Sequence, residues 1–416
     1  MNEDKKSSVG VIGAGIQGVC TSIFLVKKGF KVTLIDRDEP GNKSASYGNA
    51  GHFSHYAILQ LNRPDILLDV PTMLFSSRGP LSLKWNHIPK MIPWIVRYIR
   101  NCNQNSMLRT AKYMHQILNL SIPTYDEILS EIDTKNLIEK KGIIYIWTNK
   151  NIKSRELEIK IRKDFGIEQK ILSPKEIHDL EPNISQVYDG GVLYPGATHT
   201  RDPGRILLKL FELFLKKGGK FRKKDVRKIN FDEKKKILVK TNEDEHVFNK
   251  LVIACGAYSK ILTDQLNENI PLDTERGYHV HFKNMDHLIN RPIIFLDKGF
   301  GLTPMDQGLR AVGTVELGGL KNPLSKKRIE NIVLNAKELL PQLGNHCDEW
   351  MGFRPTLPDF LPVIGPSKIN KNIFYAFGHH HLGWTLGPIT GKIVAGLIAD
   401  EKTNLDLAPY SPIRFV

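Results

Sequence analysis

The sequence has no long hydrophobic run and few cysteines, and both absences narrow the classes of protein that it can encode. No apolar stretch approaches the ~18–20 residues that a membrane-spanning helix needs, because the densest candidate, residues 91–99, contains Pro93 and Arg97. The four cysteines show neither CxxC nor any other metal-ligand spacing, which predicts reduced thiols without a disulfide framework or a metal site. The first eight residues are polar and lead into an apolar strand pattern, so we expect no secretory signal and a cytoplasmic location.

Internal repeats and low-complexity linkers are absent as well. With 416 residues, the chain is long enough for two or three domains at ~150 residues each. Because no linker separates an N-terminal from a C-terminal half, we expect domains that are interleaved along the chain.

Acidic residues are too few to balance the basic ones, and the net charge is +15. Much of the excess lies in residues 216–224 and 234–236. This pattern is typical of a solvated surface in a lysine-rich chain, or of attraction to anionic lipid, which would place the protein peripherally on the inner membrane. A nucleic acid partner is not expected, since no RNP, zinc-finger or helix-turn-helix pattern accompanies the charge.

The start of the chain carries the strongest motif. A strand over residues 9–12, a glycine turn, a helix to residue 28 and a strand over residues 31–36 form the βαβ fingerprint of dinucleotide binding. In this motif the first glycine allows a tight turn, the second lets backbone approach a pyrophosphate, and the third lets the helix pack closely. The helix N-terminus offers free N–H groups to the phosphates. The turn consists of Gly13, Ala14, Gly15, Ile16, Gln17 and Gly18.

Asp36 ends the second strand of this unit, eighteen residues after Gly18. Its carboxylate is suited to accept hydrogen bonds from ribose hydroxyls and argues against a 2′-phosphate. We place Arg37 with it at the nucleotide end of the site. These residues alone leave both FAD and NAD open.

The rest of the chain alternates between helical and strand patterns. We expect helices over residues 80–132, after a capping box at Ser173, between residues 202 and 218, and over residues 389–398. Strands are expected over residues 142–147, 226–247, 251–256, 271–319 and 373–377.

Three separated stretches together resemble one family. Residues 9–36, residues 251–259 and the C-terminal Gly352-Phe353-Arg354-Pro355 with Gly378 and Gly383 are similar to the FAD-dependent D-amino-acid oxidase family. The loop 46–51 and the stretch 383–386 are most similar to its bacterial D-amino-acid dehydrogenase branch. The resemblance implies FAD rather than NAD. It also implies an α/β fold in which a Rossmann-like FAD-binding domain is interleaved with an α+β substrate domain of mixed sheet and helices.

The implied domains are discontinuous. The FAD-binding domain would comprise residues 1–85, 175–260 and 350–416, and the substrate domain residues 86–174 and 261–349.

The resemblance also implies further cofactor contacts. The strand ending at Gly256 would lie beside the first strand, the Val226 backbone would hold the adenine, and the 44–51 loop would approach the flavin and phosphates. The last helix would point its N-terminus at the flavin pyrimidine. Taken alone, each stretch is typical of a core strand or a surface turn. The loop and tail residues concerned are Ser44, Ser46, Asn49, Ala50, Gly51, Gly378, Gly383, Trp384 and Thr385.

Arg354 matches the arginine with which this family holds the substrate carboxylate. A guanidinium can make a two-point bond to a carboxylate and so fix the amino acid. The chain lacks the tyrosine that oxidase members carry in their sheet, and Tyr278 and His279 are the nearest polar replacements. Three consecutive histidines, residues 379–381, do not predict a metal site, because adjacent side chains diverge. Cys347 lacks the motif of covalently tethered flavins, so we expect non-covalent FAD.

The resemblance implies oxidative deamination of D-amino acids, with hydride passing from Cα to flavin N5 and electrons passing to a quinone or another carrier. The alternatives are an oxygen-using amine oxidase of the glycine or sarcosine oxidase kind, a D-hydroxyproline dehydrogenase, and the flavoprotein subunit of a hetero-oligomeric opine or amine oxidase. An FAD-holding scaffold without turnover and an NAD-dependent dehydrogenase are further alternatives. A sheet without the tyrosine would admit bulky or cyclic substrates such as D-proline derivatives.

Overall fold

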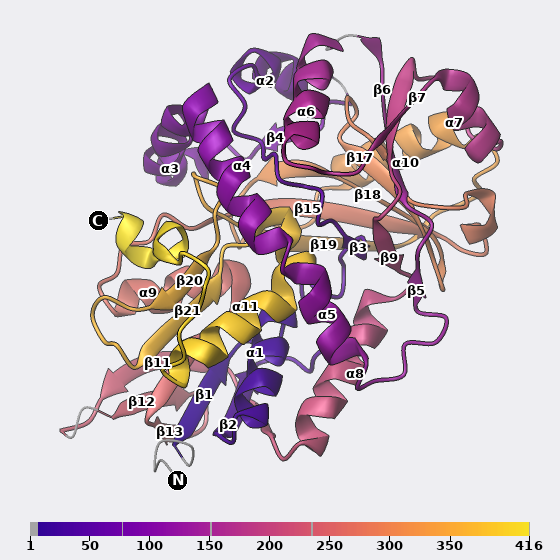
Figure 1. The fold of residues 1–416 in the computed structure, drawn as a ribbon. Helices are drawn as coiled ribbons and strands as arrows, with labels where there is room; N and C mark the ends of the chain where they lie inside the picture. Colours follow the sequence, from indigo (N-terminus) through magenta and orange to yellow (C-terminus); the bar gives the residue numbers. More distant parts are fainter. Residues whose placement is uncertain (1–6, 77, 150–151, 234–235, 416) are drawn as a thin grey trace.

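Two large sheets organise the computed structural model, which describes residues 7–76, 78–149, 152–233 and 236–415 (Figure 1). Residues 234 and 235 of the second basic run therefore lie outside the described residues. The combination of helices with mixed sheets confirms the predicted α/β class.

The first sheet has six strands, and all adjacent pairs except that of β20 with β21 are parallel. Its central strand β1 lies between β2 and β14, with Val11 opposite Leu34 on one side and Val252 on the other. The prediction that the strand before Gly256 lies beside the first strand is thus confirmed. In spatial order the strands are β10 (Lys220–Lys223), β2 (Lys31–Asp36), β1 (Ser8–Ile12), β14 (Lys250–Ile253), β21 (Ile373–Phe377) and β20 (Val363–Pro366).

Both faces of this sheet are covered, as expected for strands that are apolar on both sides. Val9, Val11 and Leu34 pack against α1 (Ile16–Lys27), α8 (Pro203–Lys216) and α11 (Gly383–Ile398), with α1 and α11 in direct contact. On the other face, Ile12 and Ile35 pack against an antiparallel sheet. That sheet consists of β11 (Val226–Phe231), β12 (Ile237–Thr241) and β13 (Glu245–Phe248).

The second large sheet has nine strands and mixes parallel with antiparallel pairs. One of its faces packs on α10 (Lys326–Leu339) and α7 (Pro174–Leu180) through a buried apolar cluster. Its strands in order are β19 (Cys347–Thr356), β15 (Asp273–Phe282), β18 (Gly308–Leu317), β17 (Phe300–Met305), β16 (Ile293–Phe295), β6 (Ile143–Trp147), β8 (Gly190–Tyr194) and β7 (Lys170–Leu172), with β4 (Leu81–Leu83) paired to β18.

Other helices and a small sheet complete the chain around these two layers. The helices are α2 (Ile66–Phe75), α3 (Ile88–Asn101), α4 (Gln104–Leu118), α5 (Ser121–Leu129), α6 (Ile152–Asp164) and α9 (Ser259–Gln265). The small antiparallel sheet consists of β3 (His52–Phe53), β9 (Thr198–Thr200) and β5 (Ile138–Glu139).

Several predicted elements match these bounds, and two differ. The capping box at Ser173 is present, with Glu176 as its reciprocal partner. The 80–132 region begins with the short strand β4 and then forms α3, α4 and α5 rather than helix throughout.

The last helix begins at Gly383, six residues before the predicted start at residue 389. Pro388 lies inside it and cannot donate to the Trp384 carbonyl one turn earlier. The Tyr125 hydroxyl donates to that carbonyl instead, so the helix continues through the proline.

The predicted domain boundaries remain a prediction, and three strands lie across them. β4, β8 and most of β19 fall within the ranges assigned to FAD binding, yet all three are strands of the second sheet. The chain crosses between the sheets at these points, which brings residues from both sheets to one interface.

The basic run over residues 216–224 is partly neutralised in the fold. Lys217 pairs with Glu131 at 2.5 Å, Lys223 with Glu39 at 3.3 Å, and Lys224 with Glu243. Within the described residues, no helix combines the length and apolarity needed to cross a bilayer.

Candidate active site

A cavity of about 1550 Å³ lies where the two sheets meet. Its walls include the carboxyl ends of β1, β2 and β14 on one side and residues of β15 and β19 on the other. Ligands of open α/β sheets bind at such strand ends. Since pockets for one small ligand measure ~300–1,000 Å³, this cavity has room for a dinucleotide and a second molecule.

The glycine turn after β1 is built for close backbone approach. Gly13 has φ +104°, and a Cβ there would lie 2.5 Å from the Ala254 carbonyl oxygen. A Cβ on Gly18 would lie 1.7 Å from the Gly13 oxygen, so α1 packs on the turn only because this residue is glycine. A Cβ on Gly15 would meet only the Ser46 hydroxyl, at 3.3 Å. The cradle that a pyrophosphate needs is therefore present.

Two side chains bond to backbone N–H groups around this turn. Ile16, the first residue of α1, donates its N–H to Ser46 Oγ at 3.0 Å. Asp36 accepts from Ala14 N at 2.6 Å and from Asp38 N at 3.0 Å. Burial raises the pKa of Asp36, although the two hydrogen bonds favour the carboxylate and act to lower the pKa. Asp36 is only partly buried and lines the cavity, as expected for a group that meets a ribose.

The loop between residues 44 and 51 forms the next part of the wall. Ser44, Ser46, Asn49 and Ala50 all line the cavity, and Asn49 Oδ1 accepts from the Gly51 N–H at 2.8 Å. Gly51 itself does not line it. Gly51 has φ +76°, and its N–H and carbonyl are used within the loop and by Thr200.

The residues predicted at the nucleotide end also lie together. Arg37, Val226 and Gly256 line the cavity with Asp36. The Arg37 guanidinium carbon lies 4.1 Å from the centre of the Tyr258 ring, within the range of a cation–π interaction.

At the start of α11, Gly383 and Trp384 line the cavity, whereas Gly378 and Thr385 do not. Gly378 has φ +85°, and a Cβ there would lie 2.3 Å from Leu357 Cδ1. Thr385 Oγ1 accepts from the Ser54 N–H at 2.9 Å. These last two residues position the helix rather than face the cavity.

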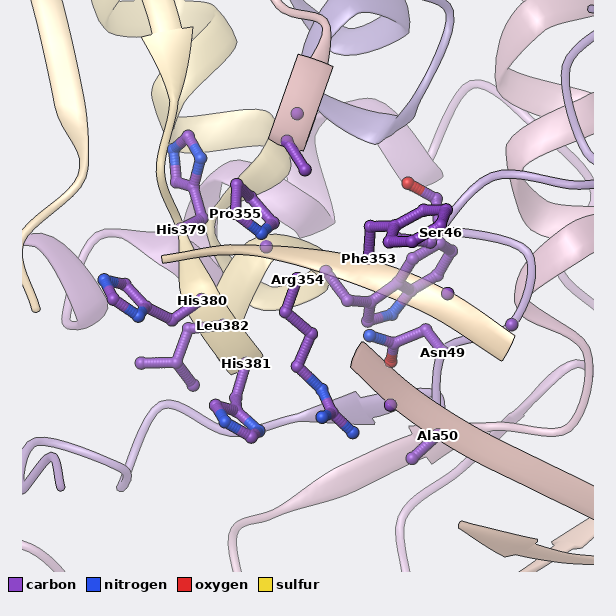
Figure 2. A pocket seen from close by; sticks show the side chains of 18 of the residues that line it. Ser46, Asn49, Ala50, Phe353, Arg354, Pro355, His379, His380, His381 and Leu382 are labelled. Carbon is purple, nitrogen blue, oxygen red and sulfur yellow. The ribbon is translucent and has the colours of Figure 1, made fainter. Parts of the chain in front are cut away.

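Arg354 extends from β19 into the cavity (Figure 2). Its Nη1 donates to the Thr314 carbonyl at 3.2 Å, and it forms no ion pair among the described residues. Gly277 makes room for it, since a Cβ there would lie 2.3 Å from the guanidinium carbon. Burial lowers the pKa of Arg354, although the negative charge of Glu275 acts to raise it. The arginine nevertheless remains cationic. The group is therefore free to bind an anion.

Tyr278 and His279 lie on opposite faces of β15, because side chains alternate along a strand. Tyr278 packs in the cluster under α10, and its hydroxyl donates to Glu316 at 2.8 Å. His279 Nδ1 lies 3.1 Å from the Gly48 carbonyl, and the ring stacks on Trp350 at 4.8 Å. Tyr278 contributes to the cavity wall, His279 does not, and neither is hydrogen-bonded to Arg354 in the described residues.

The three consecutive histidines have three different environments. His379 Nε2 bonds to Thr390 Oγ1 at 2.9 Å, and burial lowers its pKa to about 3. His380 accepts from the Leu357 N–H at 3.1 Å, and burial lowers its pKa to about 4. His381 is exposed and pairs with Glu275 at 3.0 Å. In the part of the chain that the structure describes, no three His, Cys, Asp or Glu side chains are arranged to hold a metal ion.

Glu275 is a residue of the site that sequence reasoning missed, because it stands inside a strand and belongs to no motif. Burial would raise its pKa, but the His381 hydrogen bond and the charges of His381, His380 and Arg354 outweigh burial and lower the pKa to about 2. The site therefore contains a buried carboxylate that is ionised at neutral pH.

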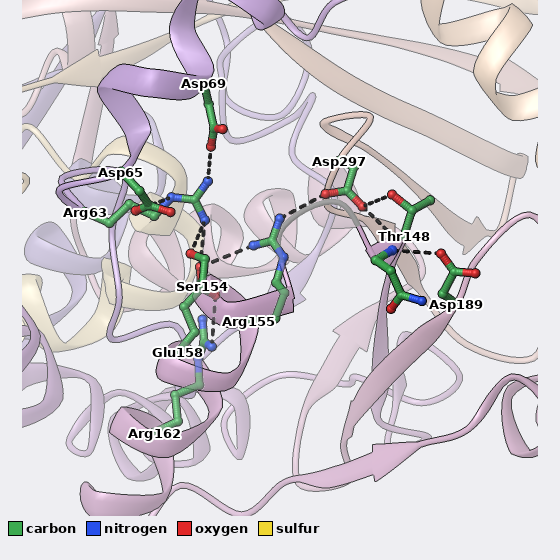
Figure 3. A network of polar contacts seen from close by, with 11 residues as sticks. Arg63, Asp65, Asp69, Thr148, Ser154, Arg155, Glu158, Arg162, Asp189 and Asp297 are labelled. Carbon is green, nitrogen blue, oxygen red and sulfur yellow. Dashed lines mark hydrogen bonds and ion pairs between the residues drawn. The ribbon is translucent and has the colours of Figure 1, made fainter.

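A second group that sequence reasoning missed is a charged cluster on the same cavity wall (Figure 3). Glu158 on α6 pairs with Arg63 at 3.0 Å, Arg155 at 3.2 Å and Arg162 at 3.3 Å. Burial opposes ionisation of Glu158, yet the three arginines lower its pKa. The cluster joins the segment before α2 to α6, and Arg155 extends it to Asp297 after β16 at 3.3 Å. Only the i,i+3 and i,i+4 spacings within α6 are visible in the sequence.

Comparisons with known proteins agree with this geometry. The family model described as FAD dependent oxidoreductase (DAO) matches residues 8–397. A D-amino-acid oxidase of Bradyrhizobium diazoefficiens is 33% identical over 415 residues, covering 98% of this chain and 99% of the relative. A D-amino acid dehydrogenase of Vibrio atlanticus is 28% identical, with 98% and 99% covered, and one of Helicobacter pylori is 29% identical, with 98% of each covered.

Solved structures share the fold. Glycine oxidase from Geobacillus kaustophilus superposes with a TM-score of 0.76 at 20% identity, covering 99% of this chain and 100% of that one. L-proline dehydrogenase from P. horikoshii superposes with a TM-score of 0.75 at 19% identity, covering 99% and 98%. At these identities the likeness concerns the architecture alone.

Proposed function

This chain belongs to the DAO family of FAD-dependent oxidoreductases, and on that premise we propose that it oxidises D-amino acids to 2-oxo acids and ammonia. The observation that carries the proposal is the position of Arg354. Its guanidinium, without a carboxylate partner among the described residues, shares one cavity with the glycine turn after β1. A carboxylate-binding group thus stands in the same space as a dinucleotide cradle.

The proposed cofactor contacts follow the cavity wall from the nucleotide end to the flavin end. Asp36 would hold the ribose, the turn at Gly15 the pyrophosphate, and the start of α11 the flavin ring, beside the loop at Asn49 and Ala50. When bound, FAD supplies the two-electron acceptor of the reaction. The N-terminus of α11 would stabilise negative charge that develops on the ring.

We propose that FAD is bound without a covalent bond. Cys347 does not line the cavity, and its Sγ contacts the His281 carbonyl. Cys255 does line it, but its Sγ donates to the Ile12 carbonyl at 3.3 Å and burial raises its pKa. A buried thiol with a raised pKa forms little thiolate, the reactive species for a tether.

In the substrate site, Arg354 would hold the α-carboxylate by two parallel hydrogen bonds, which fixes the orientation of Cα. Gly277 would keep the space in front of the guanidinium open. The proposed D-configuration rests on the similarity to relatives named as a D-amino-acid oxidase and D-amino acid dehydrogenases.

We propose a quinone or another carrier as electron acceptor, reached at a membrane surface. Helix α2 supports this, because its two faces differ. Ile66 and Met73 line the cavity, whereas Leu68 and Phe75 on the opposite face are 80% and 84% exposed. Exposed apolar side chains of this size are suited to the interface of a bilayer, and exposed basic residues on α3 would suit an anionic one. The basic residues are Lys90, Arg97 and Arg100.

An oxygen-using D-amino-acid oxidase is the second candidate, since the relative at 33% identity bears that name. Two assays on the purified protein separate the candidates. A panel of D- and L-amino acids is oxidised in the presence of a quinone analogue without oxygen, and peroxide formation is then followed in air. Oxidation of D-amino acids with quinone and little peroxide is expected. Fast peroxide production contradicts the proposed acceptor, and no oxidation of any amino acid contradicts the proposed function.

A further inference from the structure

Arg354 and His381 line the cavity and extend in the same direction (Figure 2), and Glu275 lies close to both. Glu275 on β15 is directly opposite Arg354 on β19 in the strand register. Its Oε2 lies 3.0 Å from His381 Nε2, in the turn that precedes α11. The carboxylate is 5% exposed and the histidine 40% exposed, so the pair reaches from the protein interior to the cavity.

The backbone N–H of Leu357 determines which groups donate and which accept in the hydrogen bonds around Glu275. The Leu357 N–H donates to His380 Nε2, so His380 carries its hydrogen on Nδ1 and donates to Thr356 Oγ1 at 2.7 Å. The Thr356 hydroxyl then donates to Glu275 Oε1 at 2.9 Å. Both carboxylate oxygens of Glu275 therefore accept hydrogen bonds.

This arrangement selects the tautomer of His381. An ionised carboxylate can only accept, so His381 Nε2 must carry a hydrogen. In the neutral ring Nδ1 then keeps a free electron pair, and it has no partner among the described residues. A carboxylate behind an imidazole fixes the tautomer and stabilises the imidazolium in the same way in many proton-transferring sites.

Three charged or titratable groups face His381 from the elements around it. They are Glu275 from β15, Arg354 from β19 and the adjacent His380, and all three belong to one set of interacting charges. The other two histidines are unsuited to exchange protons with a ligand, because they are buried and bonded to Thr390 and Thr356.

We propose that His381 accepts a proton from the ammonium group of the bound amino acid. The inference rests on the proposed function and deepens it. The N–H bond of the ammonium breaks, a bond from the proton to His381 Nδ1 forms, and the electron pair stays on the amine nitrogen. Only an amine with a free pair can form the carbon–nitrogen double bond as hydride leaves Cα. His381 afterwards returns its proton to water, to which it is exposed.

The test compares the wild type with His381→Gln in anaerobic rapid mixing, where flavin bleaching by a D-amino acid is followed from pH 6 to pH 10. Glutamine keeps a donor for Glu275 but cannot take up a proton. General-base catalysis contributes ~10²–10⁴-fold, so bleaching at neutral pH is expected to slow about 10²-fold or more. The deficit should shrink as the pH approaches the pKa of the free amine, since the substrate then arrives deprotonated.

A second variant tests the role of the carboxylate. Glu275→Gln removes the charge that favours the imidazolium, so the acid limb of the pH profile should move to lower pH. The dissociation constant for FAD and the flavin absorption spectrum of both variants should match the wild type. His346→Gln is the matched control, because His346 pairs with Glu349 at 3.3 Å outside the cavity.

A deficit of His381→Gln that is equal at every pH, or no deficit, overturns the inference and leaves the proposed function intact. An acid limb of Glu275→Gln that stays in place overturns the role of the carboxylate. If no amino acid bleaches the wild-type flavin at any pH, the proposed function fails, and the inference fails with it.

Discussion

The side-chain amide N–H of Gln17 donates to the Gly383 carbonyl oxygen at 2.7 Å, and the two residues are 366 positions apart in the sequence. Gln17 belongs to the first turn of α1, and Gly383 opens α11. The hydrogen bond therefore ties together two helix N-termini that both face the cavity. In the proposed complex one would meet the pyrophosphate and the other the flavin ring.

Removing the guanidinium fork of Arg354 is expected to impair substrate binding and orientation. Hydrogen bonds to charged groups contribute ~1.5–3 kcal/mol each, so losing two lowers kcat/KM for D-amino acids roughly 10²- to 10⁴-fold. Arg354→Lys keeps the charge and should recover part of this loss relative to Arg354→Ala. Steady-state kinetics on the FAD-loaded protein measure both. Arg100→Lys on the exposed face of α3 is the control, and unchanged kinetics of Arg354→Ala would contradict the carboxylate role.

Gly15→Ala separates cofactor binding from folding. Its Cβ would meet only the Ser46 hydroxyl, so the fold tolerates it, but the methyl group would occupy space in front of the backbone N–H groups. We expect a normal urea unfolding transition and at least a tenfold weaker FAD affinity, measured by flavin fluorescence. Gly344→Ala, with its nearest neighbour at 3.9 Å, is the control. Wild-type affinity in Gly15→Ala would place the pyrophosphate elsewhere.

Acid should destabilise the fold through its buried histidines. The folded-state pKa of His379 is about 3 and that of His380 about 4, against 6.5 when unfolded. Above pH 6.5 neither state binds the proton. As the pH falls below that value the unfolded chain binds protons first, and the free energy of unfolding decreases by on the order of 2 kcal/mol per histidine by pH 5. Urea midpoints at pH 7, 6 and 5 measure the slope, which His379→Asn should reduce.

The exposed face of α2, which carries Leu68 and Phe75, is expected to be required for membrane binding. A double variant, Leu68→Ser with Phe75→Ser, is expected to lose co-sedimentation with vesicles of anionic lipid. Phe231→Ser is the control, because Phe231 is 41% exposed on the small sheet β11–β13, distant in sequence from α2. Equal sedimentation of the double variant and the wild type would exclude this face as the contact.

Much of the fold could be predicted because the sequence carries local signals for it. Gly13 and Gly18 are needed for contacts of backbone with backbone, which no other residue allows, so they are visible in any sequence. The capping box at Ser173 is likewise a signal within four residues. Arg354 and the glycine turn could be joined in one site only through the family resemblance, since no local signal brings β19 to the same cavity as the turn after β1.

What could not be predicted depends on contacts between distant segments. The early start of α11 requires Tyr125 to donate to the carbonyl that Pro388 leaves free. Glu275 is important because strand register brings it to Arg354 and a turn brings His381 to it. Gly378 and Thr385 are predicted to contact the cofactor, but neither lines the cavity. Gly378 packs closely on Leu357, and Thr385 accepts a hydrogen bond from the Ser54 N–H.

The position of β1 has a consequence for how the protein is made. Its neighbours are β2, which follows at once, and β14, which begins at Lys250. At ~5–20 residues per second, the ribosome needs roughly 10 to 50 s between the two strands. During that time the edge of β1 that will pair with β14 stays open, and such edges promote aggregation. Chaperone demand during synthesis should therefore be high, and fragments that end before β14 should be insoluble.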